Sequence, residues 1–378
     1  MDTIKRIAYY GYGYKEHQDL KWYAITQYLI WQETVENGEI YFTDKLNGKK
    51  ISIFQNEINE LYNLVNESKK KPSFINKKHI MIENKNLVLT DTNNVINQYK
   101  INNQKINNNE LQISNLNEGN HNITLSKQYN NNSQPIIFYQ SPNSQTLMKT
   151  GNLDTETINL EIQVIKTNIK IYKIDSENKN IYPQGESSLN NAIFELYDEN
   201  MNLLNQYKII NNIINIENID LGKYYIKEIS PGTGYNLNTN TYEINITEND
   251  YNKELTIENN VIKKKIIIEK KYGETNHLNN ESNIKFEIYN NENKLIQTII
   301  TNNNGIAEIT LPYGKYTFKQ INTTTGYQKI EPFIIEIKDN IEEKIELTDY
   351  KIQVPNTSKN KISIFKIIYS ILINILCF

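Results

Sequence analysis

The segment "WYAITQYLIW", residues 22–31, places one side-chain amide inside an aromatic and aliphatic run. Gln27 lies near its centre, directly after Thr26. A buried amide has to be matched by hydrogen-bond partners or take part in chemistry. Gln27 is therefore the first candidate for a functional side chain.

Other reactive side chains are sparse. His17, His79, His121 and His277 lack the spacing of metal ligands, and Cys377 is the only cysteine. We therefore expect no metal, no cofactor and no disulfide. A secreted chain without disulfides has to hold small domains together by packing or by another kind of crosslink.

Composition narrows the class of protein. The formal net charge is -3 over 378 residues, which excludes a strong electrostatic footprint for nucleic acid or a polybasic membrane patch. The mean hydropathy is low at -0.63, while the 27 tyrosines supply buried area and tolerate a wet edge. This balance fits several modest β-rich domains, and the length predicts two to four.

The elements that position Gln27 are predicted to be helical. Residues 1–72 include "ISIFQNEINELYNLV", in which five apolar residues recur at helical spacing: Phe54, Ile58, Leu61, Tyr62 and Val65. A second helix is predicted from Trp22 to Val35. After Pro72 the pattern changes to short strands such as "LVLTD", "LQISNL", "HNITL" and "IIFYQS". Residues 73–163 are therefore predicted to form a connecting β-sandwich.

Residues 164–352 contain an internal repeat. "NIKIYKID" corresponds to "KIIIEKKY", "NAIFELYDENMNLL" to "NIKFEIYNNENKLI", and "LGKYYIKEISPGTGY" to "YGKYTFKQINTTTGY". The repeats are offset by about 92 residues, which is the size of a seven-stranded sandwich. The sequence predicts two tandem domains, residues 164–262 and 263–352.

Residues 353–378 end in a mostly apolar segment. Residues 362–378 are interrupted by Lys366 and Asn374, and about 17 residues of helix reach only about 25 Å, short of a ~30 Å hydrocarbon core. We expect a marginal membrane anchor, with a buried terminal strand or helix as the alternative.

The repeats resemble Cna B-type (SpaA-like, prealbumin-like) domains of Gram-positive surface proteins, through "IYKID", "AIFELYD", "GKYYIKEISPGTGY" and "LTIENNVIKKKIII". The N-terminal part resembles thioester (TQXA-type) domains through "RIAYYGYGY" and "WYAITQYLIWQE". The implied fold class is multi-domain and mainly β. It has a small α-rich partial thioester domain, followed by three Ig-like or prealbumin-like β-sandwiches in tandem.

The resemblance implies an intramolecular isopeptide bond in the first repeat, between Lys173 and Asn259 with Glu228 as the catalytic residue. Burial lowers the pKa of such a lysine, so that a neutral amine can attack the amide and release ammonia. The alternative is a snorkelling lysine, a solvated strand glutamate and a turn asparagine.

The second repeat departs from this pattern. Lys270 corresponds to Lys173, but Gln320 stands at the glutamate position and Asp349 at the asparagine position. A glutamine has no proton to give or take at neutral pH. Two outcomes stay open here, a second isopeptide bond or a buried ion pair between Lys270 and Asp349.

In thioester domains a cysteine thiol displaces ammonia from the glutamine that corresponds to Gln27. The family's cysteine lies upstream of the "YYGYG" stretch, which begins only a few residues after Met1, and Cys377 is in the expected anchor. We therefore expect Gln27 not to form a thioester within this sequence, because the sequence is N-terminally incomplete or because the domain is degenerate.

"VPNTS" resembles the sortase signal usually written LPXTG. Sortase would attack the Thr357 carbonyl and pass the chain to an amine of peptidoglycan. Ser358 replaces the usual glycine and Val354 the usual leucine; the five residues of the motif are Val354, Pro355, Asn356, Thr357 and Ser358.

Together these resemblances imply an extracellular, cell-wall-anchored adhesin or stalk protein. Its expected partners are sortase, peptidoglycan and a host surface protein, without nucleic acid and with the membrane only before sorting. Any crosslink forms once, so no turnover enzyme is expected. A minor or basal pilin subunit is the alternative, although no pilin-type lysine motif is evident. A third class, an extracellular enzyme such as a glycosidase, would need a carboxylate pair facing a cleft, and the predicted sandwiches show no such pair.

Overall fold

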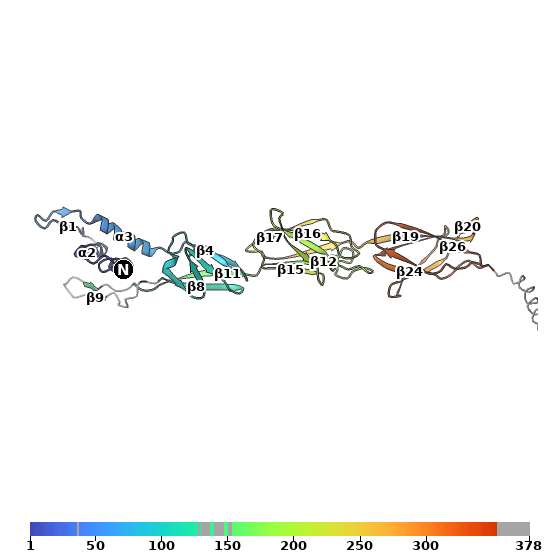
Figure 1. Cartoon of the computed structure of the whole chain (residues 1–378), viewed down its shortest axis with the longest axis horizontal. Helices are drawn as coiled ribbons and strands as arrows, with labels where there is room; N and C mark the ends of the chain where they lie inside the picture. The colour runs from blue at the N-terminus through green and yellow to red at the C-terminus, as the bar shows by residue number, and fades with distance from the viewer. Residues whose placement is uncertain (36–37, 128, 130–136, 140–146, 150–152, 354–378) are drawn as a thin grey trace, which may run out of the picture. The chain divides into compact units, whose positions relative to one another are not determined.

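A computed structural model describes residues 1–35, 38–127, 129, 137–139, 147–149 and 153–353. Strands make up 46% of the described residues and helices 13%, which confirms the mainly β fold class. Within these described ranges, the α-helices all belong to the N-terminal part (Figure 1). The chain divides into two compact units, Met1–Asn168 with Glu217–Asp220, and Ile169–Ile216 with Leu221–Phe378.

Three helices form the N-terminal core, α1 (Asp2–Tyr10), α2 (Leu20–Thr34) and α3 (Gln55–Lys69). The Asp19 side chain caps α2 by accepting a hydrogen bond from the Trp22 amide at 3.0 Å. The apolar spacing of α3 buries Ile58, Leu61 and Val65 against the other two helices. Both predicted helices are confirmed. The segment between them contains a short hairpin of β1 (Phe42–Thr43) and β2 (Lys50–Ile51).

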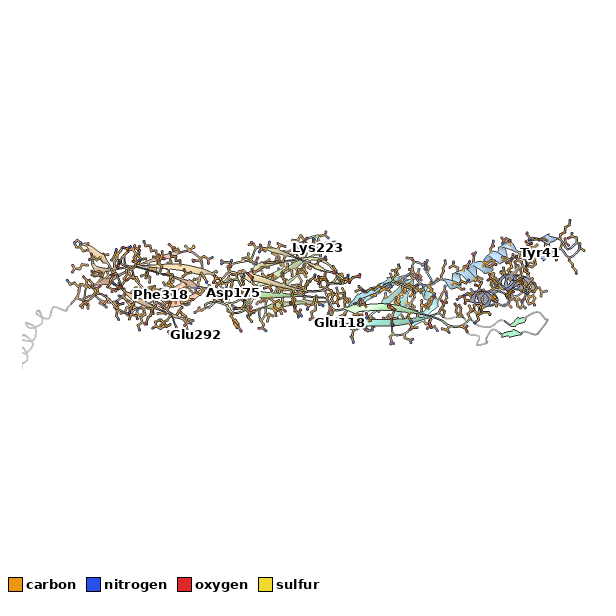
Figure 2. All side chains as sticks on the ribbon, turned by 180° about the vertical axis from the view of Figure 1, so that it is seen from behind. Tyr41, Glu118, Asp175, Lys223, Glu292 and Phe318 are labelled. Atoms are coloured by element: carbon orange, nitrogen blue, oxygen red, sulfur yellow. The ribbon has the colours of Figure 1, made fainter. Side chains whose placement is uncertain are left out.

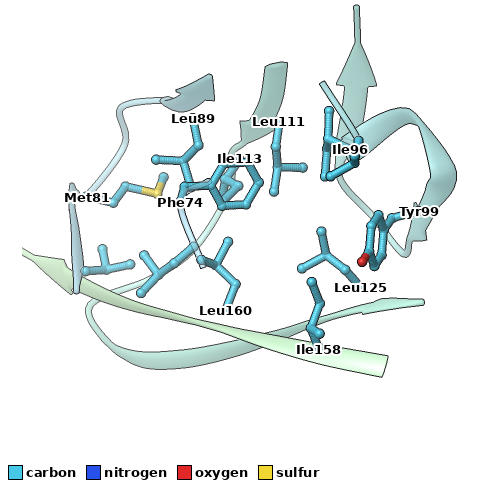
Figure 3. Packing of buried hydrophobic residues seen from close by; sticks show 13 residues of the cluster. Phe74, Met81, Leu89, Ile96, Tyr99, Leu111, Ile113, Leu125, Ile158 and Leu160 are labelled. Atoms are coloured by element: carbon cyan, nitrogen blue, oxygen red, sulfur yellow. The ribbon is translucent and has the colours of Figure 1, made fainter. Parts of the chain in front are cut away.

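The connecting segment forms two sheets around one core. The first sheet has the order β3-β11-β8-β5 and the second β4-β7-β6. Their strands are β3 (His79–Ile82), β4 (Leu87–Thr90), β5 (Tyr99–Ile101), β6 (Lys105–Asn107), β7 (Glu110–Ile113), β8 (Gly119–Lys127) and β11 (Glu156–Ile165). A separate pair consists of β9 (Ile137–Tyr139) and β10 (Leu147–Lys149). Figure 3 shows apolar side chains such as Leu111, Leu125 and Leu160 filling the space between the two sheets.

The first repeat is a sandwich of a three-stranded and a four-stranded sheet. The orders are β15-β12-β18 and β14-β13-β16-β17. The strands are β12 (Asn168–Asp175), β13 (Ile193–Tyr197), β14 (Leu203–Lys208), β15 (Ile213–Glu217), β16 (Gly222–Ser230), β17 (Thr241–Ile246) and β18 (Asn252–Asn259). Alternating buried and half-buried residues along β12 and β13 give each strand one core face.

The second repeat has the same plan with an extra edge strand. One sheet has the order β20-β19-β23, with β26 paired in parallel to β19, and the other has the order β22-β21-β24-β25. The strands are β19 (Lys263–Glu274), β20 (His277–Asn280), β21 (Lys285–Asn290), β22 (Leu295–Ile300), β23 (Ile306–Pro312), β24 (Gly314–Gln320), β25 (Phe333–Ile337) and β26 (Glu343–Tyr350). Figure 2 marks Asp175 at the end of β12 and Phe318 on β24, one residue in each repeat.

None of the helices in the described part of the chain is long and apolar enough to span a bilayer. The expected sorting signal, Val354 to Ser358, and the apolar segment after it lie outside the described residues.

Candidate crosslinking sites

Strand alternation places Lys173, Glu228 and Asn259 on the core side of the first repeat. Every second residue of β12 is buried up to Lys173 and Asp175, and the same holds for β16 up to Glu228. Asn259 is the last residue of β18, the strand beside β12. Lys173, Glu228 and Asn259 are 0%, 1% and 2% exposed, respectively.

The three side chains form a closed set of hydrogen bonds. Lys173 Nζ donates to Glu228 Oε1 at 2.6 Å and also to Asn259 Oδ1. Asn259 Nδ2 donates to Glu228 Oε2 at 2.8 Å. The glutamate therefore bridges the amine and the amide nitrogen, with one carboxylate oxygen for each.

Neighbouring groups fix this arrangement. The Asn238 amide donates to Glu228 Oε2 at 2.8 Å, and Asn259 Nδ2 donates a second bond to the Asn236 carbonyl at 2.9 Å. The Asn259 amide is thereby oriented with its oxygen toward Lys173. A surface groove of about 530 Å³ adjoins the site, and its lining residues include Asn236, Asn238 and Asn259.

Burial lowers the pKa of the Lys173 ammonium, and the hydrogen bond to Glu228 acts against this effect without reversing it. The Phe194 ring supplies an apolar wall, with its centroid 5.1 Å from Nζ. A lysine in this setting reaches its neutral, nucleophilic form more easily than one in water.

The second repeat brings together Lys270, Gln320 and Asp349. Lys270 Nζ lies 2.5 Å from Asp349 Oδ1, and Gln320 Nε2 donates to Asp349 Oδ2 at 2.5 Å. Lys270 and Asp349 are fully buried and Gln320 is 3% exposed. The three residues thus occupy the places of Lys173, Glu228 and Asn259.

A fourth residue at this site, Glu281, was missed by sequence reasoning. Its Oε2 lies 3.1 Å from Lys270 Nζ, and the residue is 1% exposed. The sequence signal for Glu281 is "KKYGETNHLNNE", in which a turn after Glu274 reverses the strand. Pairing the two arms of such a hairpin places residue 281 opposite residue 270.

Gln27 belongs to unit 1, whereas the residues of both candidate crosslinking sites belong to unit 2. It lies on α2 and is only partly buried, and among the described residues its side-chain amide has no hydrogen-bond partner. The expectation of a buried amide was therefore wrong, because this face of α2 is partly open to solvent. Cys377 lies outside the described residues.

The buried member of the pair is Thr26. Its Oγ1 donates to the Trp22 carbonyl at 2.7 Å and accepts from the Tyr12 amide at 2.8 Å. A Cβ on Gly11 would lie 2.2 Å from that oxygen, so the glycine allows the two segments to approach. Thr26 thus ties the "YYGYG" turn to α2.

Within the described ranges, no group of three histidine, cysteine, aspartate or glutamate side chains is placed to hold a metal ion.

The family model for the SpaA prealbumin-like fold domain matches residues 167–261 and again residues 264–351. The two repeats are SpaA-type domains. The two-sheet sandwich plan of each SpaA-type domain agrees with that assignment. No curated protein matches the chain.

The solved structures to which the chain is similar include three bacterial proteins. The Bacillus anthracis TIE protein is 19% identical, with a TM-score of 0.43, over 93% of this chain and 72% of that one. The minor pilin GBS52 of Streptococcus agalactiae is 12% identical, with a TM-score of 0.26, over 50% and 98%. The C-terminal fragment of the pilus adhesin SpaC from Lactobacillus rhamnosus GG is 11% identical, with a TM-score of 0.36, over 50% and 99%.

Proposed function

We propose that the protein is an extracellular surface adhesin or stalk whose first SpaA-type domain crosslinks itself through Lys173 and Asn259. The observation that carries this proposal is the buried, closed set of hydrogen bonds among Lys173, Glu228 and Asn259. Burying three polar side chains in one small core has a cost that ordinary packing would avoid. A covalent product explains why they are held together.

The reaction is a transamidation. The neutral Lys173 amine forms a bond to Cγ of Asn259, while Glu228 takes one proton from Nζ and delivers one to Nδ2. The bond between Cγ and Nδ2 breaks and ammonia leaves, with the groove at Asn259 as its route to solvent. The proton taken and the proton delivered cancel, so Glu228 ends in the state in which it began; the protein reacts once on itself and turns nothing over.

The new amide joins two neighbouring strands, β12 and β18, at opposite ends of the domain's sequence. A force applied to the ends of this domain would then act on a covalent bond instead of a ladder of hydrogen bonds. This property suits a stalk. Under the same proposal "VPNTS" is the sortase signal for attachment to peptidoglycan, and the helical part with Gln27 is a thioester-type head facing a host protein.

Intact mass spectrometry of the purified chain tests the crosslink. We expect a loss of about 17 Da, for one ammonia, that peptide mapping locates to a bond between Lys173 and Asn259, and we expect this loss to disappear in Glu228→Ala. Glu258→Gln is the matched control, since Glu258 adjoins Asn259 on β18 but forms a surface ion pair with Lys179. A full sequence mass in the unchanged, folded chain would refute the proposal.

A further inference from the structure

The second SpaA-type domain buries two carboxyl groups beside one amine. Lys270 Nζ lies 2.5 Å from Asp349 Oδ1 and 3.1 Å from Glu281 Oε2. Among the residues that the structure describes, neither of these two oxygens has a hydrogen-bond partner. Both therefore interact chiefly with the Lys270 amine.

The β19–β20 hairpin positions Glu281. β19 runs past Lys270 to Glu274, and β20 returns antiparallel with Lys271 opposite Asn280. The next residue, Glu281, donates its backbone amide to the Lys270 carbonyl at 2.9 Å. In the first SpaA-type domain β12 ends at Asp175, its described neighbours are β15 and β18, and no counterpart of β20 is among them.

Gly305 permits this close arrangement. A Cβ there would lie 2.4 Å from the Lys270 carbonyl oxygen and 3.1 Å from the Glu281 nitrogen. Its φ of +72° is also in the region that favours glycine. Any larger residue at position 305 would therefore collide with the backbone groups through which Lys270 and Glu281 pair.

The carboxyl oxygens that do not face Lys270 accept hydrogen bonds from other donors. Glu281 Oε1 accepts from the Thr324 amide at 2.8 Å. Asp349 Oδ2 accepts from Gln320 Nε2 at 2.5 Å and from Thr323 Oγ1. Gln320 therefore polarises the Asp349 carboxyl as a neutral donor, and the carboxyl that could move protons is that of Glu281.

We propose that Glu281 is the catalytic residue of a second self-crosslinking reaction, which joins Lys270 to Asp349. This inference rests on the proposed function, since it adds a second bond to the same stalk. In this domain the residue that transfers protons is therefore not on β24, where the sequence has Gln320, but is Glu281, which directly follows the β19–β20 hairpin.

The reaction is a condensation that loses water. Glu281 takes a proton from the Lys270 ammonium, and the neutral amine forms a bond to Cγ of a protonated Asp349 carboxyl. Glu281 gives that proton to the departing hydroxyl and takes a second one from the nitrogen. The C–O bond breaks, one water leaves, and Glu281 ends protonated.

Charge balance favours a starting state in which Lys270 is an ammonium, and one of the two carboxyl groups carries a proton. With all three groups ionised, the buried cluster would carry one net negative charge, which is costly away from water. One proton on the carboxyl pair makes the cluster neutral and gives Asp349 the hydroxyl that has to leave. The amide product removes the remaining charges from the core.

The test is mass spectrometry of the full chain, with peptide mapping to locate each bond. We expect the unchanged chain to lose about 35 Da in total, about 17 Da from the first SpaA-type domain and about 18 Da from a bond between Lys270 and Asp349. In Glu281→Gln the second loss should disappear or form at least about 100-fold more slowly, as expected when a general acid–base is removed. Glu274→Gln, on the same hairpin but at an exposed ion pair, should keep both losses.

A rescue variant separates lost chemistry from lost folding. Glu281→Gln with Gln320→Glu returns a carboxyl to the position that Glu228 has in the first SpaA-type domain, and it should regain the loss of about 18 Da. The inference is overturned by an undiminished rate in Glu281→Gln, by no second loss in the unchanged chain, or by a bond between Lys270 and Glu281. The loss of about 17 Da in the same chain reports separately on the first crosslink.

Discussion

At the residue scale, each SpaA-type domain has one fully buried lysine, Lys173 in the first and Lys270 in the second, held by acidic or amide side chains. Lysine is rarely buried without a partner. The partners differ, since Lys173 meets an amide and one carboxyl, while Lys270 meets two carboxyls. Ammonia is the expected leaving group in the first case and water in the second.

The lowered pKa of Lys173 predicts a pH dependence in a chain that cannot crosslink. In Asn259→Ala the folded lysine loses its proton at lower pH than the ordinary 10.5, so the unfolded chain binds more protons between these two values. The free energy of unfolding should therefore rise with pH in that window, by about 1.4 kcal/mol for each unit of depression. Urea unfolding at several pH values measures it.

The control is Lys173→Met in the Asn259→Ala background, which lacks the titrating group. As pH rises toward 10.5, the free energy of unfolding of the chain that keeps Lys173 should increase relative to that of the chain with Lys173→Met. A difference that shrinks with rising pH would contradict the lowered pKa.

At the element scale, the connecting sandwich depends on one buried carboxylate. Asp91 lies after β4 and is 1% exposed. Burial opposes its charge, but hydrogen bonds from the backbone amides of Ser73, Asn93, Val95 and Ile96 outweigh this and lower its pKa. These bonds fix the start of η1 (Ile96–Gln98) and the chain entering the sandwich.

Asp91→Asn should destabilise the connecting sandwich by about 1–3 kcal/mol, because an amide offers one acceptor oxygen where the carboxylate offers two. In the unchanged chain this stabilisation is present above pH 3.8 and is lost as pH falls through the lower pKa of folded Asp91. Hydrogen exchange at the Val95 and Ile96 amides measures the effect. Asp154→Asn, at an exposed ion pair, should leave both exchange rates unchanged.

At the scale of the whole molecule, crosslinking would divide the chain into parts of different stability. Lys173 and Asn259 are separated by 86 positions. Closing a loop of that length constrains the unfolded chain by roughly 4–5 kcal/mol, on the scale known for disulfides. Unit 1 has neither candidate crosslinking site, so it would depend on packing alone.

Pulse proteolysis in urea measures this difference. We expect fragments of the first SpaA-type domain to survive at urea concentrations that allow residues 1–163 to be degraded. Lys173→Arg should remove this advantage by lowering stability by roughly 4–5 kcal/mol, whereas Lys223→Arg, at a surface ion pair, should not. Equal protection of the two parts in the unchanged chain would count against a crosslinked stalk.

Local periodicity was enough to predict much of this protein. The helical spacing of Ile58, Leu61 and Val65 predicted α3. The strand-like segments that recur in both repeats predicted two tandem β domains. Alternation with a period of two also determines which face a residue occupies. The resemblance to Cna B-type domains implied Lys173, Glu228 and Asn259, and the fold brings these three side chains together on the core side.

Only the tertiary structure decided what meets across strands. The sequence placed Gln320 where a carboxyl was expected, and the pairing of β19 with β20 supplies Glu281 from another element. Likewise, packing left Gln27 partly exposed and buried Thr26 against the turn at Gly11. The physical reason is that hairpin register and packing depend on long-range contacts, which the period of one strand or helix does not specify.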